Sequence, residues 1–299
     1  MAIGTDQTLA PRVLLIGASS QIGVFAIARL VKAGFKVCAV SRRGRPANYP
    51  QFTQVDWLNE DQALKVVQDC QYLVSAGPMD LAQKFLAVGE QFKSAVVFSS
   101  SSVETKLVSK DSKERALIQT MLRLESALQK LAESKKIKLV ILRPTLVYGC
   151  GLDTNISRLA DWIRRFGVMP VSGRAGGLRQ PVHADDLASV AMSALLSTAA
   201  LPNVLTVAGG ETLSYADMVG KIFTALGKPV RLARLPEWLF VLFVNTANAL
   251  KAGGGINSEM VRRQAVDMVF DDHQARELLG YNPRLFNPTK ADFSLPDFE

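Results

Sequence analysis

The residues best placed for chemistry form a turn bounded by glycines near the N-terminus. The turn reads Gly17-Ala-Ser-Ser-Gln-Ile-Gly23 and stands between an apolar run and an amphipathic run. Where such a turn joins a strand to a helix, backbone N–H groups and the helix dipole can hold a pyrophosphate. A turn built only for tight packing is the alternative. The residues predicted to contact a pyrophosphate are Gly17, Ser19, Ser20, Gln21, Ile22 and Gly23.

The turn and the strand after it depart from the commonest dinucleotide-binding pattern. Ser20 occupies the middle glycine of GxxGxxG, where a side chain narrows the approach of backbone to phosphate. Eighteen residues after Gly23, where NAD-selective proteins place an acid for the ribose diol, the chain has Ser41, Arg42 and Arg43. A hydroxyl beside guanidinium groups can bind a 2′-phosphate that an acid would repel. The pattern favours NADP over NAD, with two solvated arginines as the alternative.

Two further segments stand where an adenosine would be contacted. Asp56 is predicted to follow the third strand and to reach the adenine amino group. The segment Ala76-Gly77-Pro78 follows the fourth predicted strand, and we expect it to pass close to the adenosine ribose. Both assignments rest on position along the chain.

The segments that would hold these residues alternate between short apolar runs and amphipathic runs. This alternation favours a parallel, doubly wound sheet, because such strands need helices on both faces. The predicted strands are Pro11 to Gly17, Phe35 to Val40, Gln51 to Val55, Tyr72 to Ser75, Ala95 to Ser99, Ile137 to Leu142 and Asn203 to Val207. The predicted helices between them are at 22–33, 60–69, 80–92, 112–133 and 185–197.

The rest of the chain has a different character. The segment 150–181, rich in Gly and Arg, is predicted to be a long functional loop region with one short helix. From residue 214 onward the pattern is mostly helical, at 214–226, 236–250, 257–268 and 272–279. We therefore expect an α/β protein with a smaller, mostly helical C-terminal substrate domain. The predicted division is a nucleotide-binding domain over 1–149, a substrate-domain insertion over 150–181, the last helix and strand of the first domain over 182–208, and the substrate domain over 209–299.

Composition narrows the class of protein. A chain of 299 residues with 48% hydrophobic and 21% charged residues can bury a full core. The net charge of +8 suits an anionic ligand, but the basic residues are scattered, so nucleic acid is not expected as a partner. The longest apolar run, Trp238 to Val244, is too short to span a bilayer, so no transmembrane segment is expected. Cys38, Cys70 and Cys150 are widely spaced, which predicts neither disulfides nor a metal site and fits a cytoplasmic protein.

Four segments together resemble the extended short-chain dehydrogenase/reductase family, in its NAD-dependent epimerase/dehydratase group. They are the glycine turn, Val97-Phe-Ser-Ser-Ser-Ser-Val103, Leu142-Arg-Pro-Thr-Leu-Val-Tyr-Gly149 and Leu178-Arg-Gln-Pro-Val-His-Ala-Asp-Asp-Leu187. The resemblance covers roughly residues 11–230. It implies a Rossmann-like domain with a small substrate domain, and a nucleotide-sugar-like substrate in a cleft at the carboxyl ends of the strands.

The resemblance also implies roles for residues beyond the turn. Ser100 falls at the family's catalytic Ser/Thr, whose hydroxyl hydrogen-bonds the reacting oxygen. Arg179 falls where the family clamps a substrate diphosphate, which suits a guanidinium. His183 and Asp186 are expected to fix the loop and cap the next helix. The remaining implied contacts are Ser99, Pro144 and Thr145 to the cofactor, and Ser101, Tyr148 and Asn155 to the substrate.

The family's proton-transfer pair, Tyr-x-x-x-Lys at the start of a helix, is absent from the chain. Glu125 fits the glutamate that follows this pair in the family, which places Leu117 at the tyrosine and Met121 at the lysine. Neither side chain exchanges a proton, so the family's usual mechanism cannot operate as written. Ser109 with Lys113 is a displaced alternative, although a serine hydroxyl is a much poorer acid than a phenol.

Two functions remain open. One is an atypical NADP-dependent oxidoreductase or epimerase that acts on a phosphorylated small molecule such as a nucleotide sugar. The other is a non-catalytic NADP-binding sensor or assembly subunit. An enzyme should aim Arg179 at the cleft, whereas in a cofactor holder Arg179 would pair with Asp153, Asp185 or Asp186. The helix at 112–133 could pair with a partner helix in a homodimer, or it could be covered by its own chain.

Overall fold

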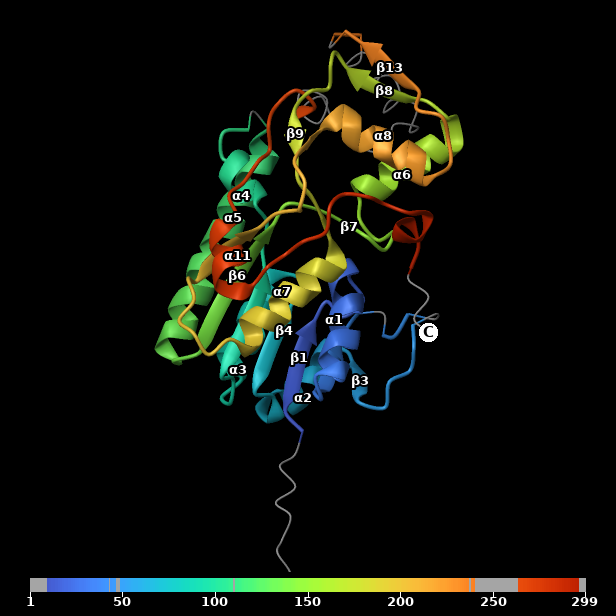
Figure 1. Ribbon diagram of the computed structural model, residues 1–299. Helices are drawn as coiled ribbons and strands as arrows, with labels where there is room; N and C mark the ends of the chain where they lie inside the picture. The colour runs from blue at the N-terminus through green and yellow to red at the C-terminus, as the bar shows by residue number, and fades with distance from the viewer. Residues whose placement is uncertain are drawn as a thin grey trace, which may run out of the picture.

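A seven-stranded parallel sheet forms the centre of the protein (Figure 1). The computed structural model describes residues 10–42, 44–46, 49–109, 111–236, 238–239 and 263–295. The strand order is β11-β6-β5-β4-β1-β2-β3, and neighbouring strands are parallel throughout, which confirms the predicted Rossmann-like α/β fold. The strands are β1 (Arg12–Ile16), β2 (Lys36–Val40), β3 (Val55–Leu58), β4 (Tyr72–Ser75), β5 (Ser94–Phe98), β6 (Lys138–Pro144) and β11 (Val204–Val207).

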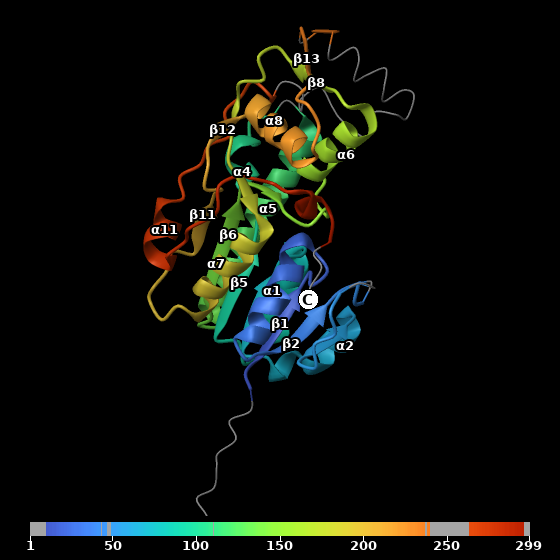
Figure 2. The same cartoon turned by 45° about the vertical axis from the view of Figure 1, so that its right-hand side comes forward.

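Helices cover both faces of this sheet, because both faces are apolar. In β1, Val13 and Leu15 belong to one core and Leu14 and Ile16 to the other, as the two-residue period of a strand requires. Figure 2 shows α1 and α7 crossing the face of the first core. The first core is covered by α1 (Gln21–Lys32) and α7 (Ala184–Leu196), and the second by α2 (Glu60–Val66), α3 (Met79–Val88) and α5 (Ser112–Ser134).

The third strand lies further along the chain than expected. The sequence predicts a strand from Gln51 to Val55, whereas β3 runs Val55–Leu58, so that prediction is wrong. The preceding residues form a turn, in which the backbone N–H of Val55 donates to the carbonyl of Phe52. Beyond this turn β3 pairs with β2 along its whole length, and Trp57 packs against the first core.

A smaller layer lies beyond the carboxyl ends of the strands (Figure 1). Its helices and one strand pair share a third core, in which Phe223 and Phe286 are fully buried. Short strand pairs connect the layers, so the segment 150–181 contains strands as well as the expected helix. The elements are β7 (Leu146–Tyr148), α6 (Ile156–Phe166), β8 (Met169–Ser172), β9 (Leu178–Arg179), β10 (Pro181–His183), β12 (Leu213–Ser214), α8 (Tyr215–Ala225) and β13 (Leu232–Leu235).

The C-terminal segment returns to the large sheet. Helix α11 (His273–Leu279) packs against β11 and α7, and a short 3-10 helix, η2 (Lys290–Phe293), follows it. Most of the predicted helix at 236–250 and the first half of the one at 257–268 lie outside the described residues, and residues 264–268 are described but not helical. The proposed domain boundaries therefore stay a prediction. Within the part of the chain that is described, no helix combines the length and apolar character needed to cross a bilayer.

Candidate functional site

The glycine turn joins β1 to α1 and has no room for side chains at its two glycines. Gly17 has a φ of +73°, and a Cβ there would lie 2.7 Å from the carbonyl carbon of Ala76. A Cβ on Gly23 would lie 2.2 Å from the carbonyl oxygen of Gly17. These approaches are too close for any side chain, so both positions require glycine. The close backbone packing at the start of α1 fits a dinucleotide pyrophosphate.

A cavity of about 400 Å³ opens over this turn. The Ser20 hydroxyl accepts a hydrogen bond from the backbone N–H of Gly23 at 3.1 Å and caps α1, so the serine at the middle-glycine position serves the helix. Gly77 packs against the backbone of Gly17, and Pro78 is the N-cap of α3. The cavity is lined by Ser19, Ser20, Gln21, Ile22, Ala76 and residues 152–155.

The end of β2 meets the turn where the adenosine ribose is expected. The Ser41 hydroxyl is 2.9 Å from the Ser19 hydroxyl. Arg42 is exposed beside it, and Arg43 lies outside the described residues. Asp56 needs a correction, because β3 begins at Val55 and Asp56 therefore lies inside the strand instead of after it. Its side chain is exposed and lines neither this cavity nor the larger one beside it.

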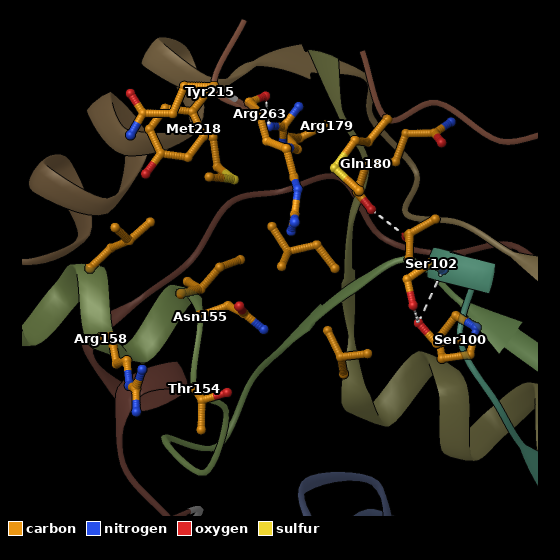
Figure 3. A pocket seen from close by; sticks show the side chains of 18 of the residues that line it. Ser100, Ser102, Thr154, Asn155, Arg158, Arg179, Gln180, Tyr215, Met218 and Arg263 are labelled. Carbon is orange, nitrogen blue, oxygen red and sulfur yellow. Dashed lines mark hydrogen bonds between the residues drawn. The ribbon is translucent and has the colours of Figure 1, made fainter. Parts of the chain in front are cut away.

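The larger cavity, of about 670 Å³, lies between the sheet and the smaller layer (Figure 3). Its volume is that of a site for a small organic molecule. Gln21, Thr154 and Asn155 line both cavities, so the two adjoin at the start of α1. The predicted site residues that line the larger cavity are Gln21, Ser99, Ser100, Ser101, Pro144, Thr145, Asn155 and Arg179.

The serine run forms one wall of the larger cavity. Ser100 donates from its hydroxyl to the hydroxyl of Ser102 at 2.8 Å and accepts from the Ser102 backbone N–H at 3.1 Å. The Ser99 hydroxyl donates to the carboxylate of Glu125, which also accepts from Arg143. These bonds hold Ser99 against α5, and leave the predicted catalytic Ser100 at the cavity wall.

Arg179 lines the cavity but is held there by backbone carbonyls. Its guanidinium donates to the carbonyls of Leu178, Val266 and Arg263 at 2.7, 2.8 and 2.5 Å. It also lies over the Tyr215 ring, 5.7 Å from the centroid. Burial lowers the pKa of Arg179. The guanidinium therefore sits at the cavity in a fixed orientation.

The carboxylates considered as alternative partners for Arg179 have other roles. Asp153 accepts from the backbone N–H groups of Asn155 and Ser157 at the start of α6. Asp185 pairs with Arg29 and Arg284, and Asp186 also pairs with Arg284. The pairing expected of a cofactor holder is not found among these described residues.

Tyr148 does not line either cavity, which corrects its assignment to the substrate. Its ring packs between His183 and Phe286, with centroid distances of 5.1 and 4.9 Å, and only 2% of the residue is exposed. His183 caps α7 by accepting from the Asp185 backbone N–H and contacts Asp292 through its other ring nitrogen. These residues join the C-terminal segment to the core.

Helix α5 contributes no residue to either cavity within the described structure. Leu117, at the expected tyrosine position, is 61% exposed, and Met121 packs against the second core. Ser109 and Lys113 are the displaced alternative to the Tyr-x-x-x-Lys pair. The Ser109 hydroxyl donates to Glu114, and Lys113 is exposed. Neither of them lines a cavity.

The larger cavity is more basic than the motifs indicate. Asp161 is the one acidic residue among the described residues that line it. Sequence reasoning missed most of its cations because they come from separate segments, although the Arg-rich composition of 150–181 was a signal for two of them. The basic lining residues are Lys106, Arg158, Arg165, Arg179 and Arg263. Such a lining attracts an anionic ligand.

Known proteins share this fold and part of this sequence. A UDP-glucuronic acid 4-epimerase from Bacillus cereus, solved with UDP-glucuronic acid and NAD, has a TM-score of 0.70 at 17% identity, covering 94% of this chain and 98% of that one. An epimerase from Methanothermobacter thermautotrophicus has a TM-score of 0.71 at 16% identity, covering 95% and 89%. A UDP-glucose 4-epimerase of Vibrio cholerae is 27% identical over 159 residues. These similarities support the NAD-dependent epimerase/dehydratase family for this chain.

The similarity to curated proteins covers only part of the sequence. The match to the Vibrio cholerae protein covers 53% of this chain and 46% of that protein. The chain spans less than half the length of the curated relatives it matches. No family model matches the chain.

Proposed function

We propose that this epimerase/dehydratase family member is an NADP-dependent oxidoreductase or epimerase acting on a nucleotide sugar. One observation carries the proposal: two cavities adjoin at Gln21. One lies over the glycine turn, and the other is lined by basic side chains. A dinucleotide in the first and a diphosphate-bearing substrate in the second would meet at the strand ends, where ligands of such sheets bind.

Within this proposal the residues divide by cavity. The turn from Gly17 to Gly23 holds the pyrophosphate, and Ser99, Pro144 and Thr145 adjoin the nicotinamide. Ser100 hydrogen-bonds the reacting oxygen of the sugar. Asn155 and Arg179 contact the substrate, with Arg179 facing its diphosphate. When bound, the cofactor supplies hydride acceptance and donation.

NADP is proposed over NAD because of the ribose end of the site. Ser41 and the exposed Arg42 offer a hydroxyl and a guanidinium where NAD-selective proteins have an acid. One solved relative named above contains NAD, so the NADP proposal for this chain rests on Ser41 and Arg42 alone. A cytoplasmic location is proposed as well, because Cys38, Cys70 and Cys150 are buried thiols outside any disulfide.

The non-catalytic alternative explains the missing tyrosine but not the larger cavity. A protein that only holds a dinucleotide needs no second basic cavity beside the first. Arg179 and the other basic residues that line this cavity also suit an anionic ligand there. The enzyme is therefore the better supported function.

Two binding measurements test the proposal. Mass spectrometry of the purified protein should identify a co-purifying nicotinamide dinucleotide, and calorimetry should show that UDP binds to the protein loaded with NADP. Arg179→Lys should weaken UDP at least tenfold, because one ammonium cannot replace a fork that also bonds three carbonyls, and should leave NADPH affinity unchanged. The exposed Arg174→Ala is the matched control. Absence of UDP binding would contradict the nucleotide-sugar assignment.

A further inference from the structure

We propose that Lys106 is the catalytic residue that exchanges the proton with the substrate, in place of the tyrosine that α5 lacks. The inference rests on the proposed oxidoreductase or epimerase function. It follows from where Lys106 lies, from the absence of α5 from the described cavity wall, and from the chemistry of the other residues that line the larger cavity.

Lys106 lies on the same short helix as the serine wall. It ends α4 (Ser102–Thr105), and its backbone N–H donates to the carbonyl of Ser102 at 3.0 Å. Residues four apart on a helical turn share a face, so the Lys106 side chain leaves α4 on the side of Ser102. Ser102 in turn accepts from the hydroxyl of Ser100. Ser100, Ser102 and Lys106 therefore all line the larger cavity from one short segment of the chain.

The other lining groups are poor candidates for proton exchange. Arginines stay protonated in proteins. Asp161 pairs with Arg164 at 2.8 Å and its side chain is 70% exposed, so it faces solvent. Burial raises the pKa of Tyr215 to about 12, and its ring lies against Arg179 at the start of α8 (Figure 3). Lys106 is the group that remains.

The surroundings of Lys106 shift its equilibrium toward the neutral form. Burial lowers the pKa of the ammonium, and the guanidinium of Arg263 lowers it further. Glu114, on α5, acts in the opposite direction, since its carboxylate is 3.7 Å from the Lys106 amine. Glu114 is shared, however, because it also pairs with Arg263 and accepts from Ser109. A neutral amine is the form that can accept a proton.

The proposed step balances atoms and charge. The hydroxyl proton of the sugar passes to the neutral amine of Lys106, the O–H bond breaks and an N–H bond forms. The hydrogen on the same carbon leaves as a hydride, so the alcohol is oxidised to a ketone, and the oxidant is the nicotinamide dinucleotide proposed above. On reduction of the ketone, the ammonium returns the proton to the oxygen.

Substitutions at Lys106 separate this role from that of a phosphate anchor. Lys106→Arg keeps the positive charge but cannot lose a proton near neutral pH, so we expect turnover of a UDP sugar to fall about 100-fold or more while UDP affinity stays within threefold. Lys106→Gln should lose turnover equally. Lys113→Arg, at an exposed lysine that lines neither cavity, should change neither. Turnover by Lys106→Arg at the unmodified rate would overturn the proposal, as would equal loss of UDP affinity in both Lys106 variants.

A titration tests the same proposal without turnover. Reductive ¹³C-methylation of the full chain gives one dimethyl-amine NMR signal for each lysine, and Lys106→Arg identifies the signal of Lys106. We expect that signal to titrate at lower pH than an ordinary lysine, because burial lowers the pKa of the Lys106 ammonium. Titration at the same or higher pH would overturn the proposal. If no UDP sugar turns over or UDP fails to bind, the proposed function fails, and the lysine titration still decides this inference.

Discussion

The hydroxyls of Ser19 and Ser41 lie 2.9 Å apart and join the glycine turn to the end of β2. This contact holds a small neutral side chain at the position where an acid would face a ribose diol. Arg42 follows on the exposed side of the same strand end. The contact therefore fixes the proposed ribose end of the site without a negative charge.

NADPH should accordingly bind more tightly than NADH. Arg42→Ala should remove most of this preference, at a cost of about 1–3 kcal/mol in NADPH binding, because a charge-assisted contact to the 2′-phosphate is lost. Fluorescence titration with both cofactors measures it. Lys36→Ala removes one charge at the far end of the same strand and should leave the preference intact. Equal affinities for the two cofactors in the unmodified protein would mean that Arg42 is only solvated.

Gly17→Ala should abolish dinucleotide binding. The added Cβ would meet the backbone of Ala76 at 2.7 Å, so the turn must shift away from its pyrophosphate-binding form. Gly34→Ala is the matched control, because Gly34 also has a positive φ, of +84°, but has nothing within 4 Å of the added atom. It should lose about 1–2 kcal/mol of stability and keep the cofactor. Calorimetry on folded Gly17→Ala protein that still binds NADPH would contradict the placement.

Restoring the family's proton-transfer pair on α5 should not raise activity. Leu117 is 61% exposed and Met121 packs against the second core, so Leu117→Tyr with Met121→Lys places both new groups away from the cavity. We expect turnover of UDP-glucose by the double variant to stay within about threefold of the unmodified protein, since the general acid–base effect of about 10²–10⁴-fold requires contact with the substrate. A rise of that size would show that α5 moves into the site.

The link between Asp292 and His183 should make stability depend on pH. Burial opposes ionisation of Asp292, but hydrogen bonds from His183 and from the Thr289 backbone outweigh it and lower the pKa of this carboxyl. Because the pKa of Asp292 is lower in the folded protein, its carboxylate stabilises the fold at pH values above the ordinary aspartate pKa. This stabilisation is lost as the pH falls through the pKa of Asp292 in the folded protein. Asp292→Asn should therefore cost about 1–3 kcal/mol at pH 7 and progressively less in acid. Urea unfolding at several pH values measures this difference.

The control for these urea-unfolding measurements at different pH values is Asp69→Asn. Asp69 pairs with Arg12 at 3.1 Å, but its side chain is 61% exposed, so the change should cost at most about 1 kcal/mol. A cost for Asp292→Asn that stays constant between pH 7 and pH 3 would contradict the assigned role of this carboxylate.

Local patterns predict the sheet and the turn well. The apolar run before Gly17 and the small residues at 41 and 76 are adjacent to elements with strong periodicity, and the structure brings them together as expected. The shift of β3 could not be predicted in this way, because pairing with β2 selects the residues that form the strand.

Residues whose role depends on distant packing were harder to predict. Tyr148 lies in a motif of the family, yet contacts with His183 and with Phe286, far along the chain, bury it. Lys106 carries no motif, and its charge environment depends on Arg263, which only the folded chain brings near. Long-range contacts of this kind leave no periodicity for sequence reasoning to detect.

Hydride transfer between a nucleotide sugar and NADP, without the family's tyrosine, is the reaction proposed for this protein. The most direct measurement loads the protein with NADP and follows absorbance at 340 nm after adding UDP-glucose, UDP-glucuronic acid or UDP-N-acetylglucosamine, in the unmodified protein and in Lys106→Arg. We predict that at least one sugar reduces the bound cofactor. In Lys106→Arg the rate should fall by about 100-fold or more. No absorbance change with any of these sugars, in protein shown by calorimetry to hold both NADP and UDP, would contradict the claim.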